Sequence, residues 1–332
     1  MALGPALNGG AMTSIFAFNG DADGLCALQQ LRLAEPGNSL LLTGVKRDIG
    51  LLGRVDATTG DQITALDISL DRNRMDVVRL LEAGASIRYF DHHYSGASLQ
   101  HPRLHTYIDE RPDTCTSLLV DHFLGGTRRA WATVAAFGDG LPTLGATLCR
   151  SLGLGSDQTK RLESLGQRLN YNAYGEEIAD LWFDPLVIAE SMRPFSDPLH
   201  FIRDSDIHVQ LGACYEEDMS RARSLRPDYQ IPGATMTILP TEAWSRRVIG
   251  VLANELANTF PRSAVAILSP RSKGGYSASI RIPAECPLAA DEFCRRFATG
   301  GGRKLAAGVN HLPAEDVDRF AAAFALRYGH LD

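Results

Sequence analysis

Ser-Ile-Arg-Tyr-Phe-Asp-His-His, residues 86–93, is the stretch that says most about the fold of this chain. Its first part is a short apolar run that predicts a buried strand, and a carboxylate and two imidazoles follow directly. Aspartates follow other apolar runs in the same way: Asp21 and Asp23 after 14–18, Asp67 after 62–66, and Asp139 after 130–137. Four segments that end in Asp or His predict one polar site at one edge of a sheet.

Strand and helix patterns alternate in the first half of the chain. Strands are predicted at 14–18, 39–43, 62–68 and 87–90, and the intervening residues include a predicted helix at 25–33 and an amphipathic stretch at 71–82. This alternation predicts βαβ units and an α/β fold with a mostly parallel sheet covered by helices on both faces. Ligands of such sheets bind at the carboxyl ends of the strands, where the Asp and His residues fall.

The pattern changes further along the chain. Asp113 is the expected N-cap of a helix over 114–123, residues 150–230 are mainly helical, and several prolines follow between 194 and 232. A second set of predicted elements comprises strands at 235–239, 264–268 and 276–282 and helices at 243–259, 289–297 and 314–328. We therefore expect a catalytic domain over 14–190, a connecting segment over 191–233 and a smaller α/β domain over 234–330.

Composition limits the classes of protein to which the chain can belong. At 332 residues, 45% hydrophobic and 22% charged, it has the profile of a soluble two-domain protein, and no apolar run is long enough for a membrane span. The net charge of −6 argues against long duplex DNA as the main ligand. Six scattered cysteines without a CxxC pair favour a cytoplasmic location. Residues 1–13 lack the basic and apolar parts of a signal peptide and are expected to be a disordered tail.

The acidic side chains can be interpreted either as metal ligands or as ordinary turn and helix-cap residues. Asp21 and Asp23 with Gly24 fit either a metal-gripping pair or a solvated Asp-Gly turn, and Asp67 fits either a ligand or a helix N-cap. Asp139 lies between two glycines, as a turn residue does. A carboxylate-rich site with one or two imidazoles suits Mn²⁺ better than structural zinc. Two such ions activate water and neutralise charge on a phosphoryl group.

The order and spacing of these motifs resemble the DHH phosphoesterase superfamily, in the branch with a C-terminal DHHA1 domain that includes RecJ-like nucleases and nanoRNases. Asp21-Ala22-Asp23-Gly24 looks like the first motif, Asp67 the second, Asp91-His92-His93 the third and Gly138-Asp139 the fourth. The stretch 300–308 resembles the glycine-rich substrate loop of the DHHA1 domain. The resemblance implies a catalytic DHH domain, a DHHA1 domain and an active-site cleft between them.

The resemblance also implies a role for each motif residue. Two divalent ions, Mn²⁺ ahead of Mg²⁺ or Co²⁺, would be shared by Asp23 and Asp67, with Asp21 completing one site and His92 and Asp139 the other. His93, with Asp91, would form the catalytic pair facing the scissile phosphate. The substrate would be held by Gly300, Gly301, Gly302 and Arg303, with Arg281 as a further cationic contact.

Two positions depart from the family pattern. Asn19 stands where many relatives place a His or Asp, and Arg303 stands where the family usually has His. An asparagine ligates weakly and cannot act as a base, whereas an arginine adds a permanent charge with bidentate reach. Two alternatives without a substrate role remain. The stretch 300–308 is then a helix entry with Arg303 in solvent, and Arg281 is a solvated strand residue.

Three functions follow from these expectations. The leading one is a Mn²⁺-dependent phosphodiesterase or exonuclease that hydrolyses short oligonucleotides or dinucleotides by two-metal activation of water. The second is a phosphatase for polyphosphate, pyrophosphate or a bisphosphorylated nucleotide. The third is a nucleotide or phosphate sensor that does not hydrolyse its ligand. The sequence leaves open the substrate, the polarity of cleavage, the interdomain angle and the oligomeric state, for which a homodimer is one candidate; no membrane partner is expected.

Overall fold

The computed structural model describes residues 12–330, and the chain divides into two compact units. The first unit contains the residues up to Gly166 together with Pro185–Ser205, and the second contains Gln167–Asp184 and the residues from Asp206 onward. The chain therefore leaves the first unit, returns to it and leaves it again. The expectation for residues 1–13 falls almost wholly outside the described residues.

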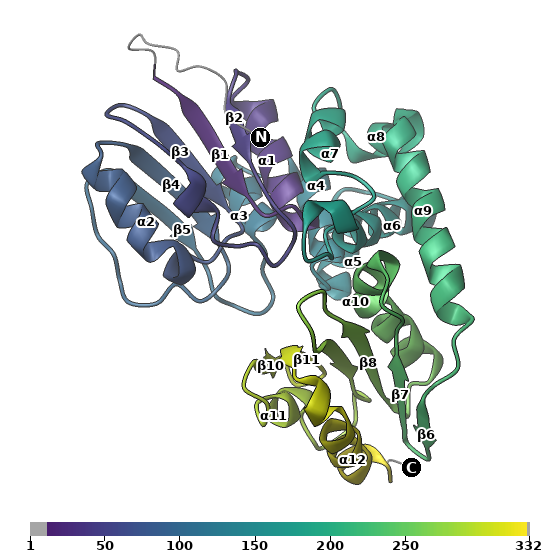
Figure 1. Cartoon of the computed structure of the whole chain (residues 1–332). Coiled ribbons are helices and arrows are strands. Elements are labelled where there is room, and N and C mark those ends of the chain that lie inside the picture. Colours follow the sequence, from purple (N-terminus) through teal and green to yellow (C-terminus); the bar gives the residue numbers. More distant parts are fainter. Residues whose placement is uncertain (1–11, 331–332) are drawn as a thin grey trace. The chain divides into compact units, whose positions relative to one another are not determined.

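The first unit is built on the predicted parallel sheet (Figure 1). Its strand order is β2-β1-β3-β4-β5, and every neighbouring pair is parallel. The strands are β1 (Ser14–Phe18), β2 (Leu40–Leu42), β3 (Gln62–Leu66), β4 (Ser86–Asp91) and β5 (Leu104–Ile108). Parallel pairing brings the carboxyl ends of the strands to the same edge, so the residues after β1, β3 and β4 meet there.

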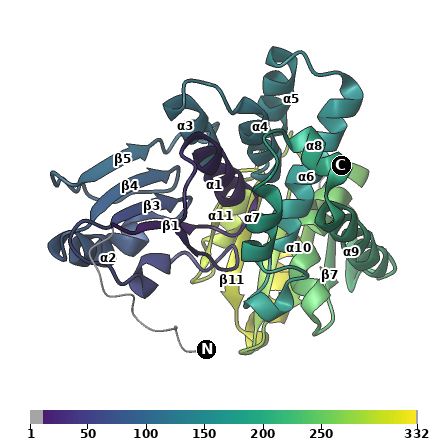
Figure 2. The ribbon, with the colours of Figure 1, turned by 90° about the horizontal axis from the view of Figure 1, so that it is seen from above.

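Helices cover both faces of this sheet, as predicted (Figure 2). On one face, α2 (Leu70–Glu82) and the 3₁₀ turn η1 (Leu51–Arg54) pack on alternate strand residues such as Ile63 and Ile87. On the other face, α1 (Ala22–Ala34) packs against α3 (Thr116–Phe123) and α4 (Arg129–Gly138). The three central strands β1, β3 and β4 are buried over most of their residues, which explains why they are mainly apolar.

Four more helices follow α4. They are α5 (Pro142–Ser151), α6 (Ser156–Asn172), α7 (Pro185–Met192) and α8 (Pro198–Asp204). The returning segment is fixed to the first unit by Gln29, whose Nε2 atom donates to the carbonyl oxygens of Met192 and Phe195 at 2.9 and 2.8 Å. The buried Trp131 likewise donates to the carbonyl oxygen of Ser196 at 3.1 Å.

The second unit has its own sheet, in the order β10-β11-β9-β8-β7-β6, with only β7 and β8 parallel. Its strands are β6 (Tyr229–Ile231), β7 (Ala234–Ile238), β8 (Ala264–Pro270), β9 (Tyr276–Arg281), β10 (Gly300–Gly302) and β11 (Ala306–Leu312). Its other elements are η2 (Ile178–Asp180), α9 (Asp206–Arg223), α10 (Ala243–Thr259), α11 (Ala290–Cys294), η3 (Ala314–Asp316) and α12 (Val317–Tyr328). Phe293 packs against Phe320, Phe324 and Tyr328 in a core of aromatic rings.

Several predictions of local structure were wrong. The stretch 300–308 is neither a loop nor a helix entry, because β10 and β11 form an antiparallel hairpin there. Helix α11 is shorter than predicted, and β5 was missed because its middle residues are exposed at the sheet edge. Asp113 does not cap α3, whose N-cap is Cys115. None of the helices in the part of the chain that the structure describes is long and apolar enough to cross a membrane.

Candidate metal centre

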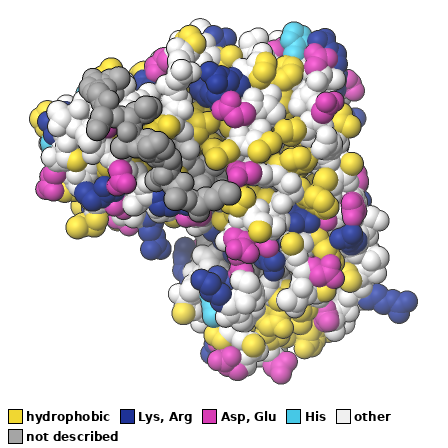
Figure 3. All heavy atoms as spheres, turned by 45° about the horizontal axis from the view of Figure 1, so that its top comes forward, with side chains coloured by type: hydrophobic (Ala, Val, Ile, Leu, Met, Phe, Trp, Pro, Cys, Tyr) yellow, Lys and Arg dark blue, Asp and Glu magenta, His cyan; other side chains and the backbone are white. Residues whose placement is uncertain are grey.

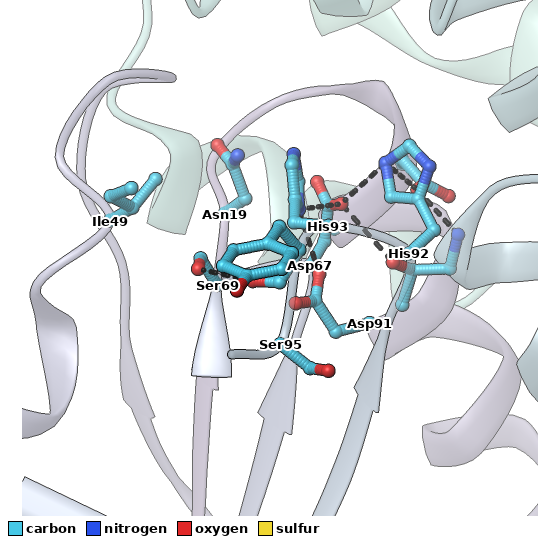
Figure 4. Close-up of polar contacts among 12 residues, drawn as sticks. Asn19, Ile49, Asp67, Ser69, Asp91, His92, His93 and Ser95 are labelled. Carbon is cyan, nitrogen blue, oxygen red and sulfur yellow. Dashed lines mark hydrogen bonds and ion pairs between the residues drawn. The ribbon is translucent and has the colours of Figure 1, made fainter. Parts of the chain in front are cut away.

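The structure brings the predicted metal ligands of the first unit to the carboxyl edge of the sheet. The Nε2 atom of His92 lies 3.4 Å from Asp67 Oδ1, 3.8 Å from Asp139 Oδ2 and 4.0 Å from Asp23 Oδ2. Single ligand atoms of Asp67, His92 and His93 all lie within 4.8 Å of one another. Figure 4 shows the two imidazole rings beside the carboxylates of Asp67 and Asp91. Side chains from β3, β4, α1 and α4 thus converge on one point.

Asp67 has an unusual backbone conformation. Its φ of 59° is the one positive value at a non-glycine residue in the described chain. Left-handed backbone is disfavoured for residues with a Cβ atom, and its presence indicates that the fold holds the residue there. Ser69, rather than Asp67, caps α2, so the Asp67 carboxylate is left for the site.

Asp23 is held by the first turn of α3. The backbone N–H of Thr116 donates to Asp23 Oδ2 and that of Ser117 donates to Oδ1, each at 2.7 Å. Thr116 Oγ1 also donates to Asp67 Oδ1 at 3.1 Å. The unpaired N–H groups of a helix start favour a carboxylate, so α3 orients Asp23 in the way a local cap would.

Asp21 has a different environment from the other acids. Its Oδ1 atom accepts hydrogen bonds from the N–H groups of Asp23 and Gly24, which makes Asp21 the N-cap of α1. Its Oδ2 atom forms an ion pair with Lys46. Burial opposes ionisation, but the charge and hydrogen bonds of Lys46 and Gly24 outweigh it and lower the pKa of Asp21. The alternative of solvated acids in an Asp-Gly turn is wrong, because Asp21 and Asp23 are both buried.

Gly24 matters for a reason other than the predicted turn. A Cβ atom at this position would collide with the carbonyl oxygen of Asn19. The glycine therefore lets α1 begin directly against the loop that carries Asn19. Asn19 is buried, its Nδ2 atom donates to the carbonyl oxygen of Lys46 at 3.4 Å, and its Oδ1 atom has no hydrogen-bond partner among the described residues.

Asp139 is the C-cap of α4, where the helix dipole disfavours a negative charge. Burial raises the pKa of Asp139, and Lys46, with Nζ 4.0 Å from Asp139 Oδ1, offsets this only in part. The Oδ2 atom is buried without a hydrogen-bond partner among residues 12–330. An aspartate that served only as a turn residue would expose this oxygen to water, so the burial of Oδ2 argues against that interpretation.

His93 and Asp91 form a close pair beside this cluster. His93 Nδ1 lies 2.7 Å from Asp91 Oδ1, and Asp91 is fully buried at the end of β4. Burial acts against protonation, but the hydrogen bond to Asp91 and the charges of Asp67 and Asp91 raise the pKa of His93. With Nδ1 turned to Asp91, the half-exposed ring has Nε2 left for a ligand.

The residues present fit a divalent cation. Burial first, and then the charges of Asp23 and Asp21, raise the pKa of Asp67 well above its usual range. Buried carboxylates this close repel one another unless a cation lies among them. The unpartnered Oδ2 atom of Asp139 and the Nε2 atom of His92 turn toward the same place. Carboxylate oxygens with one imidazole suit Mn²⁺ or Mg²⁺.

The predicted substrate-binding residues lie in the second unit. Gly300, Gly301 and Gly302 form β10, and Arg303 begins the exposed turn to β11. Arg281, on β9, donates from Nε to Asn254 Oδ1 at 2.6 Å and from Nη1 to Ser279 Oγ at 3.1 Å. Arg281 is thus held by α10 and by its own strand rather than being a solvated strand residue.

Sequence reasoning missed three residues of the site: Lys46, Thr116 and Ser117. Lys46 follows β2, a three-residue strand, and reaches Asp21 through its long side chain. Two features of the sequence could have pointed to Lys46: it follows a predicted strand, and the chain has only four lysines. Thr116 and Ser117 gave no signal, because their contacts to Asp23 join residues more than 90 positions apart.

The chain resembles known proteins in one part of its sequence and in its fold. Residues 232–327 match the family model of the DHHA1 domain. No curated protein sequence matches the chain. Among solved structures, exonuclease RecJ bound to manganese is similar with a TM-score of 0.59 and 16% identity over 95% of this chain and 90% of that one.

Two further structures are similar over nearly the whole chain. RecJ in complex with Mn²⁺ from Thermus thermophilus has a TM-score of 0.62 and 18% identity, with 95% of this chain but 51% of that chain covered. The pGpG-specific phosphodiesterase PggH from Vibrio cholerae has a TM-score of 0.53 and 15% identity, with 94% and 97% covered. The chain therefore carries a C-terminal DHHA1 domain over residues 232–327, and as a whole it shares the fold of these structures.

Proposed function

We propose that this chain is a metal-dependent phosphoesterase that uses Mn²⁺ to hydrolyse short oligonucleotides or dinucleotides. The observation that carries the proposal is the convergence on His92 Nε2 of carboxylate oxygens from Asp23, Asp67 and Asp139, all within 4.0 Å. The similar RecJ structures contain manganese, which supports this metal for the present chain. The family resemblance implies two metal ions. Lys46 pairs with Asp21, one of the expected ligands, and so affects how many ions the centre can hold.

The side chains have separable tasks in this reaction. Asp23, Asp67, His92 and Asp139 would hold the ion, which supplies an activated water and neutralises charge on the phosphoryl group. Thr116 and Ser117 orient Asp23, so that its oxygens are fixed before a ligand arrives. The contact that orients His93 against Asp91 supports a role for His93 as donor of a proton or a hydrogen bond to a phosphate oxygen. Its raised pKa favours the protonated form that this task needs.

A short substrate fits the charge of the chain better than a long duplex does. The net charge is −6, and on the face drawn in Figure 3 basic and acidic side chains are interspersed. A long duplex needs a continuous basic surface, whereas one or two phosphates need only a local cationic site. Arg303 and the N–H groups of the β10 hairpin are the groups we propose for that task, with Arg281 as a further candidate.

The compartment is part of the same proposal. All six cysteines are free, and five of them are buried. Reduced and buried thiols are typical of a reducing compartment and support a cytoplasmic location.

A substrate panel tests the proposed function. Purified protein with Mn²⁺ is incubated with RNA of about two to five nucleotides, a 5′-phosphorylated dinucleotide, polyphosphate and a 3′,5′-bisphosphorylated nucleotide. We expect mononucleotides from the short RNA and the dinucleotide, and none after removal of metal with EDTA. Release of orthophosphate from polyphosphate without oligonucleotide cleavage would establish the phosphatase instead. Tight binding of a nucleotide without turnover under any divalent metal would establish the sensor.

A further inference from the structure

The amino group of Lys46 lies inside the cluster of expected metal ligands. Its Nζ atom forms an ion pair with Asp21 Oδ2 and lies 4.0 Å from Asp139 Oδ1. The side chain is 22% exposed, so most of it is covered by protein. A lysine paired with Asp21 brings a positive charge to a place where the family resemblance implies a metal ion.

The Asp21 side of the cluster offers little to a divalent cation. Both oxygens of Asp21 already have donors, since Oδ1 accepts from two backbone N–H groups and Oδ2 pairs with Lys46. The neighbouring Asn19 is neutral and turns its Nδ2 atom to the Lys46 carbonyl oxygen. One carboxylate balanced by one ammonium leaves no net negative charge to attract an ion on this side.

The His92 side has the opposite character. Asp23 and Asp67 present oxygens to His92 Nε2, and they accept hydrogen bonds from neutral groups of Thr116 and Ser117. Asp139 marks the border between the two sides. Its Oδ1 atom faces Lys46, whereas its Oδ2 atom lies 3.8 Å from His92 Nε2 and has no hydrogen-bond partner among residues 12–330.

We propose that the Lys46 ammonium takes the place of one of the two ions, so that the resting centre holds a single divalent ion between Asp23, Asp67, His92 and Asp139. This inference rests on the proposed function of the cluster as a metal centre. Lys46 supplies the second positive charge of the site without an exchangeable ion.

The number of bound ions tests the proposal without an activity assay. Mn²⁺ is titrated into metal-free protein by calorimetry, and electron paramagnetic resonance then separates isolated Mn²⁺ from a spin-coupled pair. For the wild type we expect one ion per chain and the hyperfine pattern of isolated Mn²⁺. A spin-coupled pair in the wild type overturns the proposal, and this result does not depend on the folding of any variant.

Variants at Lys46 add a matched comparison. In Lys46→Met the repulsion between ammonium and metal is gone, so we expect a second ion to bind and the first to bind at least about tenfold more tightly. Lys46→Arg keeps the charge and should keep one ion, and Lys160→Met, at an exposed position on α6, should match the wild type. Unchanged ion number and affinity in folded Lys46→Met overturn the proposal.

Hydrolysis of the substrate panel is measured on the same preparations and decides a separate question. A one-ion protein that cleaves nothing contradicts the proposed function but leaves the role of Lys46 standing. A two-ion protein that cleaves short RNA supports the proposed function but contradicts the role of Lys46.

Discussion

Thr116 donates a hydrogen bond of 3.1 Å from Oγ1 to Asp67 Oδ1, the same oxygen that lies 3.4 Å from His92 Nε2. The backbone N–H of Thr116 also donates to Asp23. One residue at the start of α3 therefore orients two carboxylates of the metal centre, although it would not touch the metal itself. Supporting hydrogen bonds of this kind fix a ligand oxygen in the position that binding requires.

Thr116→Val removes the hydroxyl and keeps both the volume and the backbone N–H. We expect a loss of about 1 kcal/mol in the free energy of unfolding and an affinity for Mn²⁺ about tenfold lower. Calorimetric titration with Mn²⁺ and urea unfolding measure the two effects. Thr116→Ser keeps the hydroxyl and serves as the control. Equal Mn²⁺ affinities for the valine and serine variants would contradict a role of this hydrogen bond in metal binding.

Asp67→Asn separates the stability of the metal-free protein from its function. Burial, followed by repulsion from Asp23 and Asp21, raises the pKa of Asp67, and a neutral amide relieves both effects. Asparagine also tolerates a positive φ. We expect the metal-free variant to be about 1–3 kcal/mol more stable than the wild type. Hydrolysis should fall by at least about 100-fold. Chemical unfolding in EDTA measures the first effect, and a variant less stable than the wild type would contradict the account.

The three glycines of β10 are expected to differ in what they tolerate. A Cβ atom at Gly300 would collide with the Cys294 carbonyl oxygen, and Gly302 has a φ of 138°, whereas nothing lies within 4 Å of a Cβ atom at Gly301. Alanine at Gly300 or Gly302 should lower the free energy of unfolding by about 1–3 kcal/mol. Gly301→Ala should stay within about 0.5 kcal/mol of the wild type. Thermal unfolding of the three variants gives the ranking, and a large loss at Gly301 would contradict it.

Glu176 gives the second unit a defined pH dependence. Burial opposes its ionisation, but hydrogen bonds from Ser272 and Arg271 outweigh this and lower the pKa of Glu176 from 4.5 to about 2. A carboxyl whose pKa is lowered by folding stabilises the protein above its unfolded pKa, and this stability is lost as the pH falls from 4.5 toward 2. Because the group is partly exposed, we expect Glu176→Gln to be about 1–2 kcal/mol less stable at pH 7.

Unfolding of wild type and Glu176→Gln at a series of pH values measures this difference. The gap between the two should shrink as the pH falls below about 4, because the wild-type carboxyl then becomes neutral too. A gap that stays constant down to about pH 3 would show that the ionised form of Glu176 is not what stabilises this contact.

Much of the first unit could be predicted because each buried strand is an apolar run that ends in a polar residue. Parallel pairing then places Asp21, Asp67 and Asp91 at one edge without further information. The edge strand β5 escaped prediction because His105, Thr106 and Tyr107 are exposed and interrupt the apolar pattern. Propensity also fails for β10, since glycines form no strand on their own and take this conformation through pairing with β11.

The missed parts of the site share another cause. Lys46 reaches Asp21 from a loop, and the N–H groups of α3 reach Asp23 across more than 90 positions of sequence. A cap at Asp113 was expected because caps are usually local, but here a carboxylate from α1 satisfies the start of α3. Contacts of this kind depend on how helices pack and leave no periodic signal in the sequence.

One measurement decides whether this cluster is the metal centre: the initial rate of Mn²⁺-dependent cleavage of a 5′-phosphorylated dinucleotide, compared between wild type and His92→Ala. His92 is the residue on which Asp23, Asp67 and Asp139 converge, whereas the exposed His105 on β5 gives a matched control. We predict that His92→Ala is at least about 100-fold slower and binds Mn²⁺ more weakly, and that His105→Ala equals the wild type. A folded His92→Ala variant that cleaves at the wild-type rate would contradict the assignment of this cluster as the metal centre.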